Sequence, residues 1–199
     1  RQVNLCVPLV SLEGRYFMNA RRITRIAIMA ALTFVGSLIR IPIGPIPITF
    51  QTIFVILTAL FLNPVDAGLA MAVHFVLMLA LKGGALFVSP SSGFLISFIV
   101  AAVLGSLIAH RTAFGKTTVG LLVATLVTAA ACYLIGLPYM AYVLNVLNGK
   151  SMNLMKILQV GLIPFIPGDL IKAGIAFIVA KIALPHVYPL LQGPEKYAH

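Results

Sequence analysis

The chain has 199 residues, of which 61% are hydrophobic and only 9% are charged, and its formal net charge is +10. Soluble domains carry about 25% charged residues, so this composition excludes the soluble globular classes and is typical of a polytopic membrane protein. Lys and Arg stand mainly at the ends of apolar segments, where they set topology, and the positive charge therefore does not indicate nucleic-acid binding.

The length allows about six membrane spans of about 20 residues, with short loops between them. Residues 1–17 precede Met18, which together with the Asn-Ala-Arg-Arg that follows has the pattern of a native start. We therefore expect residues 1–17 to be a non-native or disordered extension. Residues 18–199 are expected to form a single six-helix domain in the lipid bilayer.

The first apolar run extends from Ile23 to Ile39 and is long enough to cross a membrane. Several arginines precede it, which predicts a cytoplasmic N-terminus. Basic residues flank both the first and the sixth span, so an even number of spans and a cytoplasmic C-terminus are expected. The loops between the spans are less decisive, because their basic residues would fall on both sides.

A proline-rich segment, Ile41 to Ile48, follows the first run and contains Pro42, Pro45 and Pro47. Closely spaced prolines remove backbone donors and favour extended structure, so this segment cannot be a helix. Extended backbone at membrane depth is tolerated only where protein covers it or where it lines a cavity. The segment is an exposed connector or a lid, and its apolar character favours the lid.

Two short helices are predicted next, at Thr49 to Leu62 and Ala67 to Leu81, with a tight turn at Asn63 to Asp66 between them. They are expected to form a hairpin. The stretch from Lys82 to Ser92 contains glycine and proline at several positions and is predicted to be a loop.

The fourth and fifth spans are predicted at residues 93–109 and 117–137, joined by a basic turn. From residue 138 to 166 polar residues interrupt the apolar pattern, as expected for interfacial helices and a long outer loop. The sixth span is predicted to begin near Asp169 and to end near Pro185.

Asp169 and Lys172 form a charged pair inside this last apolar stretch, whereas the other three acidic residues lie at ends or turns. Three residues apart on a helix, the two side chains share one face and can meet. A charge near the middle of a membrane helix costs roughly 2.5–3.5 kcal/mol on insertion scales, so such residues usually face an interior and serve a site. The pattern alone allows a second interpretation, in which Asp169 caps the helix and Lys172 extends to the membrane interface.

The sequence contains no complete motif for catalysis or for nucleotide binding. Gly115-Lys-Thr-Thr118 lacks the first glycine of a phosphate loop because position 110 is His, so any ATP dependence must come from a partner. No Ser stands in a G-x-S-x-G turn, and four acidic residues are too few for a carboxylate-rich metal enzyme. His74 is expected to be a neutral imidazole bonded to a neighbouring helix. We therefore predict no enzyme, catalytic residue, cofactor or metal site.

Ala27 and Ala31 lie one turn apart on the first span, and Ala101 and Gly105 repeat this spacing. Small residues four apart let another helix approach closely. On the pattern alone, ordinary packing inside the bundle is the favoured interpretation for both pairs.

Three motifs together resemble the BioY family, the biotin-binding S components of energy-coupling-factor (ECF) transporters. They are Gly44-Pro-Ile-Pro-Ile-Thr-Phe-Gln-Thr52, the loop from Gly83 to Phe94, and Pro164-Phe-Ile-Pro-Gly-Asp-Leu-Ile-Lys172. The resemblance extends from about Arg22 to Lys181. It implies an all-α bundle of six transmembrane helices in a prokaryotic plasma membrane, with a vitamin pocket near the outer face. A proline-rich extended loop between helices 1 and 2 would close over this pocket.

The resemblance also implies partners and site residues. A transmembrane T component would contact Ala27 and Ala31, and two ATPase subunits would drive transport. Asp169 and Lys172 match the family's paired ligand residues. The acid is suited to the ureido N–H groups of biotin, and the base is suited to a carboxylate or to the ureido oxygen. Further residues are expected to line the pocket, namely Gln51, Phe87, Ser89, Ser91 and Tyr139.

Some family members carry an Asn in the glycine-rich loop and an Arg shortly after it, and this chain has neither. The group that binds the ligand carboxylate therefore stays open, with backbone groups, Ser89, Ser91 and Tyr139 as candidates. Three other functions also stay open: an S component for another small vitamin, a membrane enzyme using Ser91 or His74, and a passive channel.

Overall fold

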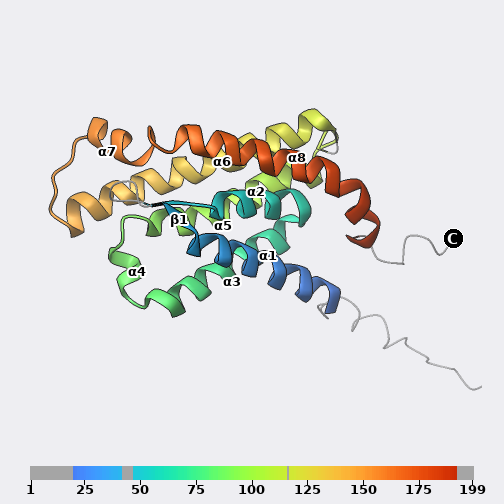
Figure 1. The fold of residues 1–199 in the computed structure, drawn as a ribbon, viewed down its shortest axis with the longest axis horizontal. Helices are drawn as coiled ribbons and strands as arrows, with labels where there is room; N and C mark the ends of the chain where they lie inside the picture. Colours follow the sequence, from blue (N-terminus) through green and yellow to red (C-terminus); the bar gives the residue numbers. More distant parts are fainter. Residues whose placement is uncertain (1–19, 42–46, 116, 192–199) are drawn as a thin grey trace, which may run out of the picture.

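The structure, a computed structural model, describes residues 20–41, 47–115 and 117–191 and is almost entirely helical (Figure 1). The expected extension at residues 1–17 and the centre of the proline-rich segment, residues 42–46, lie outside the described residues. The elements in chain order are α1 (Ala20–Leu38), β1 (Arg40–Ile41), β2 (Ile48–Thr49), α2 (Gln51–Phe61), α3 (Pro64–Lys82), α4 (Ala85–Val88), α5 (Ser92–Arg111), α6 (Thr118–Tyr142), the π-helix η3 (Val143–Leu147), α7 (Leu154–Gly161) and α8 (Ile166–Leu191).

The long helices run back and forth along one common direction (Figure 1). One end of the bundle carries β1, α4 and α7, while the start of α1 and the end of α8 lie at the other end. The two strands are antiparallel, with Arg40 paired to Thr49 and Ile41 to Ile48. This pairing brings the chain back from α1 directly into α2.

Helix α2 occupies the centre of the bundle and contacts α1, α3, α5, α6 and α8. It has 11 residues and is therefore only about 16 Å long, whereas the hydrocarbon core of a bilayer is about 30 Å thick. Most of its side chains are buried. The surrounding longer helices thus shield a helix that is too short to span the hydrocarbon core.

Three helices in the described part of the chain are long and apolar enough to cross a membrane: α3, α5, and the continuous stretch of α6 and η3. Helices α7 and α8 add a fourth span if they are taken together across the 47° bend between them. The protein is thus a helical membrane protein, and its described residues contain three or four spans by length and composition.

Helix α1 divides into two faces. Ile26, Met29 and Thr33 belong to the face that is buried against the bundle, while Ala27 and Ala31 are exposed on the other face. Exposed apolar residues such as Ile28 and Leu32 are normal on a membrane protein, because lipid covers them. The alanine pair is therefore available to an outside helix and does not serve packing within this chain.

Helices α5 and α6 pack closely along glycines. A Cβ added at Gly105 would lie 1.8 Å from the Thr128 hydroxyl oxygen, and one added at Gly136 would lie 2.6 Å from the Phe94 ring. Real Cβ atoms essentially never come this close, so a larger residue at either position would force the neighbouring side chain to shift. Gly105 therefore serves helix packing inside the bundle, as the sequence pattern favoured.

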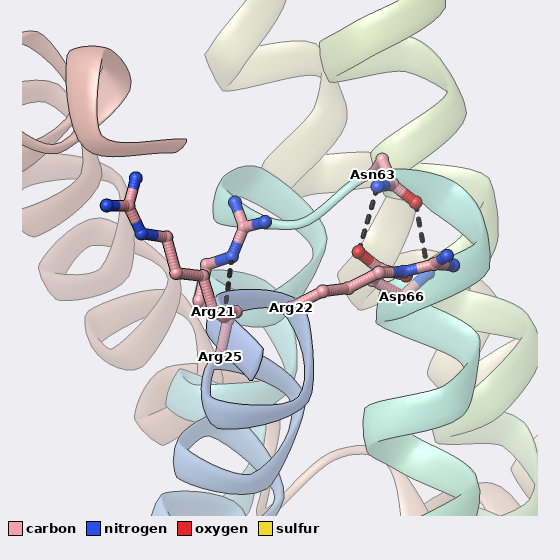
Figure 2. A network of polar contacts seen from close by, with 5 residues as sticks. All are labelled: Arg21, Arg22, Arg25, Asn63 and Asp66. Atoms are coloured by element: carbon pink, nitrogen blue, oxygen red, sulfur yellow. Dashed lines mark hydrogen bonds and ion pairs between the residues drawn. The ribbon is translucent and has the colours of Figure 1, made fainter. Parts of the chain in front are cut away.

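A polar network joins α1 to the start of α3 (Figure 2). The Arg22 Nε lies 2.5 Å from Oδ1 of Asp66, and the Asn63 amide donates to Oδ2 of the same carboxylate at 2.9 Å. Asn63 also caps α3 by accepting from the Asp66 backbone N–H at 3.1 Å. Asp66 is only 2% exposed, so the network satisfies an acid that would otherwise be buried without a partner.

Some element boundaries differ from the sequence-based expectations. The expected tight turn at residues 63–66 is instead the capped first turn of α3, where Pro64 is tolerated because its missing N–H needs no partner. Helix α6 continues through Pro138 to Tyr142 and then widens into η3. Helix α8 starts at Ile166 and passes Pro185. In membrane helices, neighbouring groups and local π geometry re-satisfy the carbonyls that proline frees.

Candidate functional site

A cavity of about 730 Å³, its open mouth included, lies among α1, α2, α3, α5, α6 and α8, with the β1–β2 pair at its edge. Its walls combine aromatic and aliphatic side chains with several polar groups. The lining residues are Ser37, Arg40, Pro47, Thr49, Gln51, Thr52, Met78, Lys82, Ser91, Phe94, Leu95, Phe98, Cys132, Tyr133, Phe165, Asp169 and Lys172. A mostly apolar hollow with a few convergent polar groups is the usual form of a small-molecule site.

Asp169 and Lys172 form the most strongly charged part of this cavity. Because α8 begins at Ile166, Asp169 lies in its first turn and Lys172 follows on the same face. The ammonium lies 2.6 Å from Oδ1 of Asp169, and the side chains are 8% and 13% exposed for Lys172 and Asp169. The pair is therefore largely buried, yet both members reach the cavity.

Tyr133 of α6 completes this cluster. Its hydroxyl donates a hydrogen bond to Oδ2 of Asp169, so each carboxylate oxygen has one protein donor. An ionised carboxylate has about four acceptor positions. Asp169 can therefore accept further hydrogen bonds from a ligand, and Lys172 retains further N–H donors.

A second polar group is formed by Gln51, at the start of the buried helix α2. Its amide nitrogen lies 2.9 Å from Nε2 of His74 in α3, and its amide oxygen accepts from the Thr49 hydroxyl at 3.0 Å. These contacts hold the amide against the cavity wall and use one of its two N–H donors. His74 is fully buried, and its contact with Gln51 confirms the expected bond to a neighbouring helix.

Aromatic side chains form the apolar wall. The ring of Phe94 meets that of Tyr133 edge to face, with centroids 6.0 Å apart and an interplanar angle of 84°. Phe98 and Leu95 extend the same wall along α5. Such a contact orients Tyr133 toward Asp169 and leaves an apolar surface for the body of a ligand.

Four of the predicted pocket residues, Asp169, Lys172, Gln51 and Ser91, line this cavity. The sequence also placed the first two within one turn of each other, and they do form an ion pair.

Phe87, Ser89 and Tyr139 are not among the residues that line the cavity. Phe87 contacts the ring of Phe75 with centroids 6.5 Å apart, and the Ser89 hydroxyl lies 2.9 Å from that of Ser91. Tyr139 packs close to Gly93 of α5. Their role toward a ligand stays a prediction.

Sequence reasoning missed Tyr133, Arg40 and Lys82. The signal for Tyr133 was available, because a tyrosine within an apolar span needs a partner for its hydroxyl. Arg40 and Lys82 stand at helix ends, where basic residues are ordinarily explained by topology. Among the described residues, no group of three or more His, Cys, Asp or Glu side chains could hold a metal ion.

Comparison with known proteins decides the family. The model of the BioY family matches residues 10–189, which is most of the chain. The chain belongs to the BioY family. The BioY motifs that carried the resemblance include Gln51 and the Asp169–Lys172 pair, both of which lie at the cavity.

Several BioY relatives are similar over nearly their whole length. The probable biotin transporter BioY of Pyrococcus horikoshii is 31% identical over 172 residues, which cover 82% of this chain and 96% of that protein. The biotin transporter BioY of Thermotoga maritima is 33% identical over 168 residues, covering 80% and 94%. The probable biotin transporter BioY of Bacillus subtilis is 36% identical, covering 78% and 84%.

Two solved structures share the fold seen here. The crystal structure of the S-component for biotin from an ECF-type ABC transporter has a TM-score of 0.66 and 25% sequence identity, covering 80% of this chain and 88% of that one. The S component of a bacterial ECF transporter has a TM-score of 0.58 at 19% identity, covering 87% and 98%, and its likeness concerns the fold alone.

Proposed function

We propose that this BioY chain is the biotin-binding S component of an ATP-driven ECF transporter for vitamin uptake, and not an enzyme. One observation carries the proposal. A hydrogen-bonded acid–base pair lies in an apolar-walled cavity of a protein whose relatives are named biotin transporters.

The chemistry of biotin matches the two kinds of surface in the cavity. Its ureido group offers two N–H donors and one carbonyl, which suit an acceptor-only carboxylate and an ammonium donor respectively. Its bicyclic body is apolar and suits the wall that includes Phe94 and Phe98. In this arrangement Asp169 receives the ureido N–H groups, while Lys172 donates to the ureido oxygen.

Lys172 also compensates the negative charge of Asp169 before the ligand enters. A single buried charge in this environment would be costly, whereas the pair compensates itself and Tyr133 satisfies the remaining carboxylate oxygen. The ligand then adds hydrogen bonds to a group that its protein partners already hold in position. Such preorganisation favours tight capture of a dilute vitamin.

Energy for transport is proposed to come from partners. Helices α1, α2, α3, α5, α6 and α8 would form a six-helix bundle in a prokaryotic plasma membrane, with the short α2 enclosed by the other helices. Both termini would lie in the cytoplasm and the pocket near the outer face. A transmembrane T component would pack on the exposed Ala27–Ala31 face of α1, where two small side chains permit close helix approach. Two ATPase subunits would complete the module.

The direct test is titration of purified protein with biotin after Asp169→Asn substitution. Asparagine replaces one acceptor oxygen with a donor and removes the charge, so we expect at least tenfold weaker binding, or about 1.4 kcal/mol. Asp66→Asn is the matched control, because Asp66 is the other acid among the described residues and lies outside the cavity. Unchanged affinity of the Asp169→Asn variant would remove Asp169 from the site.

Mass spectrometry of the small molecule that co-purifies with the wild-type protein tests the ligand itself. Intact biotin supports the proposal. Another vitamin would retain the S-component function with a different substrate, and a chemically altered biotin would indicate an enzyme.

A further inference from the structure

Two basic side chains, Arg40 and Lys82, line the cavity in addition to the Asp169–Lys172 pair. Arg40 is the first residue of β1, two residues after the end of α1, and Lys82 is the last residue of α3. Arg40 is exposed and Lys82 is half-buried, so both stand at the open side of the cavity. They are close enough for the positive charge of Arg40 to act on the ammonium of Lys82.

The backbone holds Arg40 in a defined position. Its Nε donates to the carbonyl of Ser37 at 2.9 Å, and Arg40 in β1 is paired with Thr49 in β2. Arginine has five N–H donors, so this contact leaves most of the guanidinium for another acceptor. Both neighbours, Ser37 and Thr49, also line the cavity.

The acids of the described residues are engaged elsewhere. Asp66 pairs with Arg22 at the start of α3, whereas Lys82 lies at its end, 16 residues and therefore about 24 Å along the helix. Asp169 pairs with Lys172. Within the part of the chain that the structure describes, no carboxylate is thus left for Arg40 and Lys82, which repel each other unless an anion binds between them.

The two polar clusters of the cavity therefore differ in kind. The Asp169 cluster has an acid and a base that cancel, so it offers no net positive charge to a ligand carboxylate. The Arg40–Lys82 cluster has two positive charges that nothing among the described residues cancels. An elongated ligand with a neutral polar head and an anionic tail matches the cavity in one orientation only.

We infer that Arg40 and Lys82 form an anion subsite that binds the carboxylate of the ligand, while the Asp169–Lys172 pair binds its neutral ureido head. The inference rests on the proposed function for the identity of the ligand. It also explains two basic residues at the proposed outer end of the bundle, where the positive-inside tendency disfavours them. Their place in the chain serves ligand binding and not topology.

The experiment compares biotin with its primary carboxamide, which has the same head and chain length but no charge. Equilibrium dissociation constants are measured by calorimetry on the purified full chain. The wild type should bind biotin at least tenfold more tightly than the amide. In the double variant Arg40→Gln/Lys82→Gln, biotin should lose this advantage while the affinity for the amide changes less than threefold.

Two controls separate charge from fold. Arg40→Lys/Lys82→Arg keeps both charges and should retain the preference for biotin. Lys150→Gln removes a basic residue that does not line the cavity and should leave both affinities unchanged.

The outcomes distinguish the subsite from the function. If the wild type binds biotin and the amide equally, or if the double glutamine variant still prefers biotin, the anion subsite is wrong although the protein still binds biotin. If the wild type binds neither compound, the proposed function itself is wrong, and the subsite inference falls with it. If the double variant does not fold, the single variants Arg40→Gln and Lys82→Gln are compared in the same way, and each should lose part of the preference for biotin.

Discussion

At the scale of single residues, Asp169 determines the chemistry of the cavity because its two oxygens have different partners. Lys172 compensates the charge from the same helix, and Tyr133 donates from α6 across 36 residues of sequence. A carboxylate held in this way keeps one orientation, in which it can accept the donors of the proposed ligand without moving. Tyr133 is therefore a positioning residue for Asp169.

Replacing Tyr133 by Phe tests this role. The variant retains the ring contact with Phe94 but removes one donor to a charged group, an interaction worth about 1.5–3 kcal/mol. We expect the dissociation constant for biotin to rise roughly tenfold or more, measured by calorimetry. Tyr142→Phe is the control, since that side chain is exposed and lies outside the cavity. Equal affinities for Tyr133→Phe and wild type would show that Lys172 alone orients the acid.

At the scale of elements, the short helix α2 and the polar network between α1 and α3 determine how the bundle is held together. Helix α2 supplies a buried core around which the longer helices pack. The Arg22–Asp66–Asn63 network fixes the start of α1 against the start of α3, far from the cavity (Figure 2). We therefore expect stability and ligand binding to depend on opposite ends of α3.

Asp66→Asn should therefore lower stability without changing affinity. The variant leaves Arg22 without a charged partner and disturbs a buried carboxylate that accepts two side-chain donors, which typically costs about 1–3 kcal/mol. Thermal unfolding of the purified protein without ligand should show a lower midpoint. Biotin affinity of the folded fraction should equal that of the wild type, and a large loss of affinity would contradict the separation of the two ends.

At the scale of the whole molecule, the exposed face of α1 and the ligand cavity lie on different surfaces of the protein. Ala27 and Ala31 face outward, whereas Ser37 at the end of the same helix lines the cavity. Helix α1 therefore belongs both to the proposed partner interface and to the cavity wall. Assembly and capture can be separated by substitutions on its two faces.

Ala27→Leu/Ala31→Leu should prevent assembly while sparing capture. Two bulky side chains push a neighbouring helix away from a surface that small residues keep close. Biotin titration should match the wild type, and co-purification with the T component and the ATPase subunits should be lost. Ile28→Leu/Leu32→Ile, at exposed positions that are already bulky, is the control. Recovery of the complete complex with the alanine variant would place the interface elsewhere.

The amino-acid sequence by itself determined the membrane class, the positions of most helices and the contact between Asp169 and Lys172. These features follow from local properties of the chain. The apolar content indicates that the helices lie in lipid, and charged residues and prolines mark where helices are expected to end. A spacing of three residues places two side chains on one helix face. The helix ends predicted from proline were wrong where membrane packing tolerates proline, as at Pro138 within α6.

Only the tertiary structure decided which distant residues meet. Tyr133 reaches Asp169 across 36 positions, Arg22 reaches Asp66 across 44, and Arg40 and Lys82 line one cavity from the ends of α1 and α3. No local pattern contains these pairings, because they depend on how whole helices pack and on which of their ends lie together. The sequence therefore shows which residues are charged, whereas only the packing of the helices determines which of them form a cluster together.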